Sequence, residues 1–327
     1  MRRLNLMKRN KIVLIGSGHV GSSFAYALVS HGSADELAII DIDTEKAEAD
    51  VWDLNHTTPF SHKPVNVYIG DYSDCQDADI IVICASASLP KGETRLKLLE
   101  DNVEIFVPMV QKIVDQGFDG HIILPSNPVD IMSYVVKKVS GFPKSKVIGT
   151  GTLLDSSRFQ YYIGQALNVA PQSVYAPVVG EHGDSQIAVW SHARVAGEPV
   201  LPMLQQRYGN NVDAEVHRIT EITKNVGYDI YVRKGTTCFG VALGILRVVE
   251  AILNNQNIIL NVSSYVEGEY GLTDLYIGTP TRINGAGAQQ VIELKLTEEE
   301  QYQLQQSAAV IHDYQQRADA LIEKFKK

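Results

Sequence analysis

Residues 11–41 read KIVLIGSGHVGSSFAYALVSHGSADELAIID, and this stretch decides the fold of the first half of the chain. An apolar run, Ile12–Ile15, leads straight into the glycine turn Gly16-Ser17-Gly18-His19-Val20-Gly21. Apolar residues then recur at helical spacing, and a second apolar run, Leu37–Ile40, ends at Asp41. The order of strand, glycine turn, helix, strand and acid is typical of a unit that binds the pyrophosphate and ribose of a dinucleotide.

The three glycines of the turn have separate physical tasks. Gly16 permits the tight turn, Gly18 lets the backbone approach phosphate, and Gly21 lets the helix pack closely on the strand. Backbone N–H groups at the start of the helix, around His19 and Val20, then face the anion. We interpret His19 as a spacer that lines the cofactor, not as a catalyst.

The acid that ends the second strand selects the cofactor. Asp41 lies 20 residues beyond Gly21, the spacing at which an acid accepts hydrogen bonds from ribose hydroxyls. The same carboxylate repels a 2′-phosphate, and Ile42 offers that phosphate no cation. The sequence therefore predicts NAD, not NADP, as the cofactor.

Length and composition indicate an ordinary globular protein. The 327 residues, 45% hydrophobic and 20% charged, are enough for about two domains of roughly 150 residues each. The net charge is −9 and no basic run is present, so nucleic acid is not an expected partner.

Cysteine usage and the N-terminal sequence bear on location. Cys75, Cys84 and Cys238 form no CxxC motif, so neither a disulfide scaffold nor a structural metal is expected. The basic start, with Met1 or Met7 as the initiating residue, precedes only four apolar residues, too few for a signal peptide. No window approaches 18 apolar residues, so we expect a cytoplasmic protein with no membrane partner.

The first half alternates apolar runs with helical patterns, which predicts a doubly wound parallel sheet. The expected helices are Thr44–Leu54, Leu96–Gln116 and Val129–Val139. The expected strands are Lys11–Ile15, Leu37–Asp41, Val65–Ile69, Ile80–Ala85, His121–Pro125 and Val147–Thr150. We therefore expect an α/β fold with a NAD-binding Rossmann domain over residues 1–149.

The second half changes character, and we expect an α+β domain with antiparallel strands over residues 150–327. Its expected helices are Leu154–Leu167, Val212–Arg233, Gly240–Leu253 and a last helix that begins at Thr297 with Glu300 in a capping box. A strand is expected over Val174–Val179, and an antiparallel meander over Ile258–Val266, Leu275–Ile283 and Val291–Leu296.

Several polar residues follow strand ends, where ligands bind in such sheets. Each also has a plainer interpretation. Arg95 follows a Gly- and Pro-containing loop that could serve as a lid, or it is a solvated surface charge. Asn127 before Pro128 either bonds a ligand or only forms a turn. Asp155 and Arg158, three apart on a helix, form at least a local ion pair. His182 stands between glycines after a strand, where it is either a structural histidine or one that titrates in catalysis.

Together, these segments resemble the lactate and malate dehydrogenase superfamily, most closely its L-lactate dehydrogenase branch. The resemblance runs from Lys11 to the last helix. It rests on GSGHVG, DLNHTTPF (Asp53–Phe60), GETRL (Gly92–Leu96), SNPVD (Ser126–Asp130), GTGTLLDSSRF (Gly149–Phe159), GEHGDS (Gly180–Ser185) and KGTT (Lys234–Thr237).

The resemblance implies a role for each matching residue of a substrate domain that spans residues 150–327 and of the loops facing it. His182 matches the proton donor and acceptor, Asp155 the carboxylate that orients it, and Arg158 the clamp on the substrate carboxylate. Arg95 matches the lid arginine that polarises the carbonyl on closure. Asn127 matches an amide near nicotinamide and substrate, Thr237 lines the pocket, and Ala85 lies beside the cofactor.

Two positions depart from the family pattern and bear on the substrate. Leu89, six before Arg95, stands where lactate enzymes usually have Gln and malate enzymes Arg. An apolar side chain leaves the second carboxylate of oxaloacetate unpaired, which disfavours malate dehydrogenase. Gly227 stands where alanine is typical, so the pocket is expected to be roomier. We expect a small 2-oxo acid as substrate, either pyruvate or a larger apolar analogue taken by a broad-specificity, 2-hydroxyisocaproate-like enzyme.

The resemblance also carries expectations about regulation and assembly. Relatives activated by fructose 1,6-bisphosphate have a basic residue and a histidine where this chain has Gln160 and Tyr175. Neither can supply a positive charge near neutral pH, so no activation by that sugar phosphate is expected. The resemblance implies a homotetramer or dimer whose reaction is linked to glycolysis. A non-catalytic NAD sensor on the same fold is the alternative from another class, but it would need no His182, Asp155, Arg158 and Arg95 together.

Overall fold

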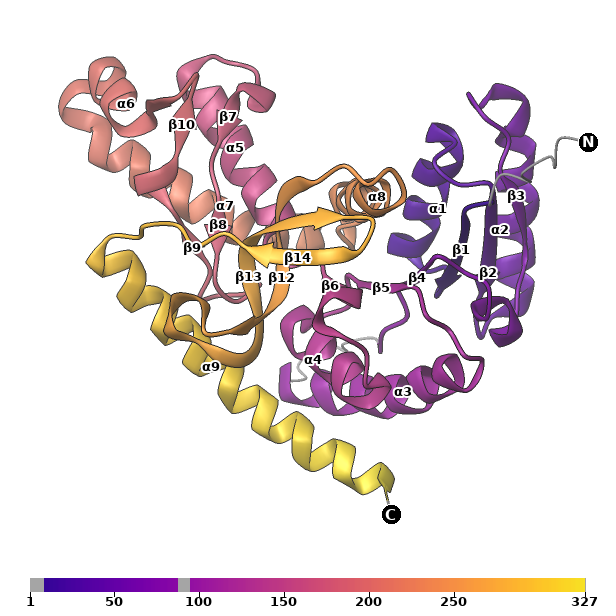
Figure 1. The fold of residues 1–327 in the computed structure, drawn as a ribbon. Coiled ribbons are helices and arrows are strands. Elements are labelled where there is room, and N and C mark those ends of the chain that lie inside the picture. The colour runs from indigo at the N-terminus through magenta and orange to yellow at the C-terminus, as the bar shows by residue number, and fades with distance from the viewer. Residues whose placement is uncertain (1–8, 88–94, 327) are drawn as a thin grey trace, which may run out of the picture.

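The computed structural model describes residues 9–87 and 95–326 and contains one large sheet (Figure 1). Its strand order is β14-β13-β12-β6-β5-β4-β1-β2-β3, and the six strands from β3 to β6 are parallel. The strands are β1 (Lys11–Ile15), β2 (Glu36–Ile40), β3 (Asn66–Ile69), β4 (Ile80–Ile83), β5 (His121–Leu124), β6 (Val147–Gly149), β12 (Ile258–Glu267), β13 (Thr273–Asn284) and β14 (Gly287–Val291). Successive strands are added in one direction from β1 to β3 and in the opposite direction from β4 to β6. The point of reversal lies between β1 and β4, and ligands of doubly wound sheets bind at such a point.

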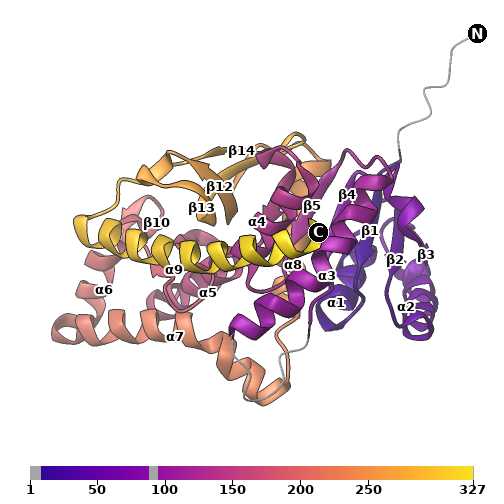
Figure 2. The same ribbon diagram turned by 90° about the horizontal axis from the view of Figure 1, so that it is seen from below.

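Both faces of the sheet are covered because its strands are apolar on both sides. Along β1, Ile12 and Leu14 belong to one buried cluster and Val13 and Ile15 to the other. The first cluster lies under α1 (His19–His31), α2 (Thr44–Thr57) and α8 (Phe239–Leu253). The second lies under α3 (Arg95–Asp115), α4 (Val129–Ser140) and α9 (Glu298–Ile322), and Figure 2 shows α9 running across this side.

The antiparallel strands of the second half extend the same sheet, since Ser263 of β12 pairs with Gly149 of β6. A smaller lobe with its own core, including Phe159 and Ile219, is built from α5 (Leu153–Leu167), α6 (Val200–Tyr208) and α7 (Val212–Lys234). Its short strands are β7 (Val174–Tyr175), β8 (Val178–Val179), β9 (Ile187–Ala188), β10 (Arg194–Val195) and β11 (Glu198–Pro199). Short 3-10 helices span Thr58–Phe60, Tyr72–Cys75, Lys144–Lys146, Pro171–Ser173, Trp190–His192, Gly209–Asn211, Glu269–Gly271 and Glu323–Lys326.

The prediction of one strand over Val174–Val179 is wrong. Tyr175 pairs with Arg194 in one sheet, whereas Val178 pairs with Ala188 in another. Pro177 separates the two segments, and it has no N–H to donate to a ladder. The apolar run is therefore divided between two different partner strands, β10 and β9.

The prediction of a strand over Val291–Leu296 is also wrong, because β14 ends at Val291. Beyond it, the N–H of Leu294 donates to the hydroxyl of Tyr270 at 2.8 Å instead of to a neighbouring strand. Leu294 and Leu296 still pack against the core, which explains the strand-like alternation.

The start of α9 forms as predicted. The Thr297 hydroxyl accepts from the Glu300 N–H at 3.2 Å, and Glu300 Oε2 accepts from the Thr297 N–H at 2.9 Å. This capping box satisfies two N–H groups at the helix start. Within residues 9–87 and 95–326, no helix is both long enough and apolar enough to cross a membrane.

Candidate active site

The glycine turn between β1 and α1 has the geometry that a pyrophosphate requires. Gly16 has φ +95°, and a Cβ there would lie 2.4 Å from the backbone nitrogen of Ala85. A Cβ on Gly21 would lie 1.9 Å from the Gly16 carbonyl, so only glycine lets α1 approach this closely. The space over Gly18 is open, and no described side chain caps α1. The first N–H groups of α1 are thus available to an anion, which fits NAD.

The predicted cofactor acid lies at the end of β2, beside this turn. Asp41 Oδ2 accepts from the Ser17 N–H at 2.6 Å, and Oδ1 accepts from the Asp43 N–H at 2.9 Å. Lys46 also reaches the turn, donating to the Ser17 carbonyl at 2.6 Å and to Asp50 at 2.6 Å. The carboxylate is therefore held beside the turn at the place where a ribose would lie.

The loop that carries His182 is fixed just before the histidine by hydrogen bonds of its backbone. Gly180 and Gly278 of β13 exchange two backbone hydrogen bonds of 3.0 and 2.9 Å. The N–H of Glu181 donates to the Ser307 hydroxyl of α9 at 2.7 Å. The histidine thus extends from a rigid position after β8, and its side chain is 27% exposed.

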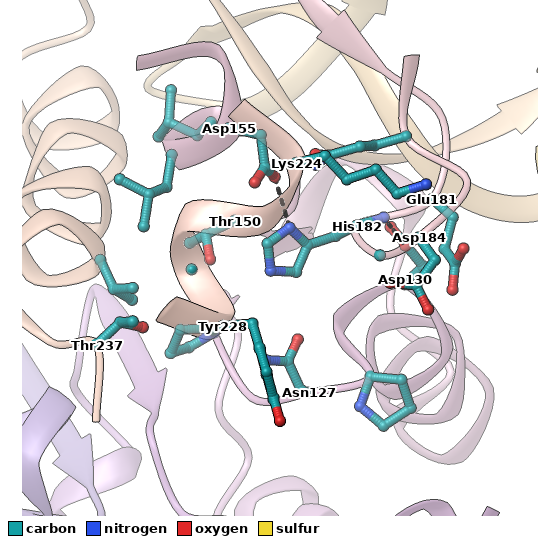
Figure 3. Close-up of a pocket in the computed structure, with 18 of the residues that line it drawn as sticks. Asn127, Asp130, Thr150, Asp155, Glu181, His182, Asp184, Lys224, Tyr228 and Thr237 are labelled. Atoms are coloured by element: carbon teal, nitrogen blue, oxygen red, sulfur yellow. Dashed lines mark hydrogen bonds and ion pairs between the residues drawn. The ribbon is translucent and has the colours of Figure 1, made fainter. Parts of the chain in front are cut away.

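Asp155 links the histidine to the arginine of the same helix. Its Oδ2 lies 2.6 Å from His182 Nδ1 (Figure 3). Its Oδ1 accepts a hydrogen bond from Arg158 at 3.0 Å. Burial opposes ionisation of Asp155, but His182 and Arg158 outweigh it and lower the pKa of this carboxyl. Burial likewise opposes the imidazolium of His182, but the charges of Asp155 and Asp130 outweigh it and raise the pKa of the ring. The pair therefore favours a charged histidine that can give up a proton.

Gly227 of α7 lies directly against the guanidinium of Arg158. A Cβ at this position would lie 3.0 Å from Arg158 Nη2 and 3.1 Å from Nη1. Because such contacts are tighter than usual, an alanine here would require the arginine to shift. The space left by the glycine therefore bears on where the arginine sits as well as on the room for substrate.

A cavity of about 400 Å³ lies at the carboxyl ends of the parallel strands. Of the predicted residues, the cavity brings together Asn127, Asp155, Arg158, His182, Gly227 and Thr237. Figure 3 shows the His182 ring directed into the space between Thr150, Asn127 and Tyr228. Leu89 and the side chain of Arg95 lie outside the described residues.

The cavity is also lined by residues for which no role was predicted from the sequence. Asp130, Lys224 and Tyr228 all line it. Asp130 is the last residue of the motif SNPVD, and this position in the motif is the sequence feature that could have marked it as a site residue. Buried Asn102 of α3 joins two strand ends, since its amide donates to the Asn127 carbonyl at 2.7 Å and accepts from the Ala87 N–H at 2.7 Å.

The chemistry that these residues can perform is proton transfer to or from an anionic substrate. His182 can donate a proton into the cavity, and Arg158 presents a planar cation for a carboxylate. A hydride delivered to a ketone carbon would leave an alkoxide that needs such a proton. The site therefore suits reduction of a 2-oxo acid next to a nicotinamide.

The chain belongs to the lactate/malate dehydrogenase family. Residues 10–149 match the model of its NAD binding domain, and residues 152–323 match that of its alpha/beta C-terminal domain. The chain is 65% identical over 319 residues to an L-lactate dehydrogenase of Staphylococcus haemolyticus, covering 98% of this chain and all of the relative. It is 47% identical over 318 residues to L-lactate dehydrogenase 1 of Staphylococcus aureus, covering 97% of this chain and all of the relative.

Solved structures show the same similarity to the L-lactate branch. The minor L-lactate dehydrogenase of Enterococcus mundtii, in its ligands-bound form, is 37% identical with a TM-score of 0.91, over 95% of this chain and 98% of that one. A lactate dehydrogenase from a deep-sea metagenome is 38% identical with a TM-score of 0.92, over 96% and 100%. The predictions of this fold class, of an oxidoreductase and of NAD as cofactor are confirmed.

Proposed function

We propose that the protein is an L-lactate dehydrogenase that transfers a hydride reversibly between NADH and a 2-oxo monocarboxylic acid, pyruvate first. The observation that carries the proposal is the contact series His182–Asp155–Arg158 within one cavity beside the NAD-binding sheet. Its relatives support the lactate assignment over a broad-specificity alternative, because they carry the L-lactate dehydrogenase name. A sensor without catalysis would have no use for this series.

In this proposal, residues 1–149 hold NAD and residues 150–327 supply most of the substrate site. NAD supplies and accepts the hydride when bound. His182 exchanges the proton, Asp155 orients it, and Arg158 grips the substrate carboxylate. Asn127 and Thr237 line the substrate site. The cofactor is contacted by Gly16, Gly18, His19, Val20, Gly21, Asp41 and Ala85. Arg95 is proposed as the residue that polarises the carbonyl.

The substrate preference is tested by comparing kcat/KM for a panel of 2-oxo acids. We expect pyruvate and 2-oxobutyrate to be good substrates, since one buried methylene is worth roughly 1 kcal/mol, and we expect the larger 2-oxoisocaproate and phenylpyruvate to be poorer. Oxaloacetate should be the poorest, because Leu89 cannot pair its second carboxylate. A strong preference for oxaloacetate would disprove the assignment, and strict selectivity for pyruvate would remove the expectation of a roomier pocket.

We expect no activation by fructose 1,6-bisphosphate. The relevant positions hold Gln160 and the half-exposed Tyr175. Arg194, paired with Tyr175 across the strands, already donates to the carbonyls of Ser191 and Ala193 at 2.9 Å. The measurement is the KM for pyruvate with and without the sugar phosphate. A large drop in KM would contradict the prediction.

We further propose that the protein is a cytoplasmic homo-oligomer, a tetramer or dimer, and that it reoxidises NADH formed in glycolysis. The three cysteines are unpaired, which suits a reducing compartment. A groove of about 650 Å³ between α1, α2 and α8 exposes Tyr26, Phe239 and Leu243, an apolar surface suited to a second copy. Light scattering of the purified protein distinguishes the oligomer from a monomer.

A further inference from the structure

Asp130 is a buried carboxylate directly behind His182, and the roles above leave it unused. It lies in the first turn of α4 and is 2% exposed. Its Oδ2 accepts a hydrogen bond from the backbone N–H of His182 at 2.8 Å. Its Oδ1 accepts one from the hydroxyl of Ser263, a fully buried residue of β12. The carboxylate therefore ties the histidine loop to the central sheet.

The fold works against the charge of this carboxylate. Burial raises the pKa of Asp130 to about 6, although the hydrogen bonds from Ser263 and His182 and the charge of His182 oppose the rise. The group is thus mostly ionised at pH 7, yet ionisation is less favourable than in the unfolded chain. A neutral side chain of the same shape would avoid this cost. Stability alone does not account for an acid at this position.

The charged groups around His182 make a second carboxylate consequential. Asp155 and Arg158 face it from α5, Glu181 and Asp184 flank it in its own loop, and Lys224 faces the cavity from α7. Arg158 disfavours the imidazolium, whereas Asp155 and Asp130 favour it. Asp155 contacts the ring, but Asp130 acts from behind the backbone. Removing the charge of Asp130 would leave Asp155 as the carboxylate in contact with His182 that offsets burial and the arginine.

We propose that Asp130 is a positioning residue with two tasks. Its carboxylate fixes the His182 backbone so that the imidazole faces the cavity, and its negative charge favours the imidazolium that donates the proton. This inference rests on the proposed function, because it concerns the proton that reduction of a 2-oxo acid requires.

Asp130→Asn tests the charge with little change in shape. The asparagine keeps an oxygen that accepts from the His182 N–H, and its NH2 group can donate a hydrogen bond to the Ser263 hydroxyl oxygen. In pyruvate reduction, kcat/KM falls as pH rises through the pKa of His182, since the acid form is needed. Without the Asp130 charge the imidazolium is less stable, so this fall should move to lower pH by about 1 unit. In lactate oxidation the rise with pH should move in the same direction.

Ser263→Ala is the matched control, because it removes the other hydrogen bond and leaves the carboxylate in place. Since that bond favours the ionised form of Asp130, the pH profile of Ser263→Ala should move in the same direction as that of Asp130→Asn, but by less. The melting temperature of Asp130→Asn at pH 7 should not fall, since the substitution removes a buried charge. An unmoved profile in an Asp130→Asn protein that binds NADH normally would overturn the proposal, and a lower melting temperature with it would identify a structural role.

Two further measurements keep the outcome unambiguous. If Asp130→Asn does not fold, Asp130→Ser is used, which is smaller and also neutral. The pyruvate activity of the unsubstituted protein is measured first. Absence of that activity would contradict the proposed function, whereas an active protein with an unmoved variant profile contradicts only the role of Asp130.

Discussion

Replacing His182 with asparagine should lower kcat/KM for pyruvate by about 10³-fold, equivalent to about 4 kcal/mol of transition-state stabilisation. The imidazole is the group that the structure directs into the cavity with its Nδ1 held 2.6 Å from Asp155. Asparagine can donate a hydrogen bond but cannot give up a proton near neutral pH. The developing alkoxide would then have to take its proton from water.

The affinity for NADH should hardly change in this variant, because the glycine turn and Asp41 belong to another part of the site. Fluorescence titration with NADH and steady-state kinetics measure the two effects separately. His62→Asn, at an exposed position before β3, is the control and should keep full activity. A His182→Asn protein that binds NADH and turns over normally would remove the histidine from the mechanism.

Arg158→Lys should lower kcat/KM for pyruvate roughly 100-fold, about 3 kcal/mol, mainly through a higher KM. The arginine is held by Asp155 at 3.0 Å and lies against Gly227, so its planar fork is fixed before substrate arrives. A lysine keeps the charge but cannot present two parallel N–H groups to a carboxylate. The loss therefore measures geometry separately from charge.

A matched control exists on α7, where Arg218 pairs with Glu215 three residues before it, the same separation as Arg158 and Asp155. Arg218→Lys should leave the KM for pyruvate unchanged, since this exposed pair does not line the cavity. Equal KM values for Arg158→Lys and the unsubstituted protein would mean that the arginine does not bind the substrate carboxylate.

The parts of the fold that could be predicted from sequence are those determined locally. The unit β1–α1–β2 follows from apolar runs and glycines within residues 11–41. The division of Val174–Val179 between two sheets could not be predicted, because it depends on Arg194 and Ala188 as strand partners. The end of β14 depends in the same way on the Tyr270 hydroxyl, which lies 24 residues from Leu294.

The same distinction applies to the site. Motifs indicated His182, Asp155 and Arg158, and the structure places them in contact, although their roles remain predictions. Asp130 lies 52 residues from His182 and 133 from Ser263, so only the folded chain brings it behind the histidine. Its type and position were visible in the motif SNPVD, but its hydrogen-bond partners were not.

The most direct test of the proposed reaction follows the hydride itself. The purified protein is incubated with pyruvate and NADH carrying deuterium at both C4 positions, and the product is analysed by NMR and chiral chromatography. Direct transfer predicts L-lactate with deuterium at C2, formed in proportion to the NADH consumed. Bound NADH without turnover, D-lactate, or L-lactate without deuterium at C2 would contradict the account.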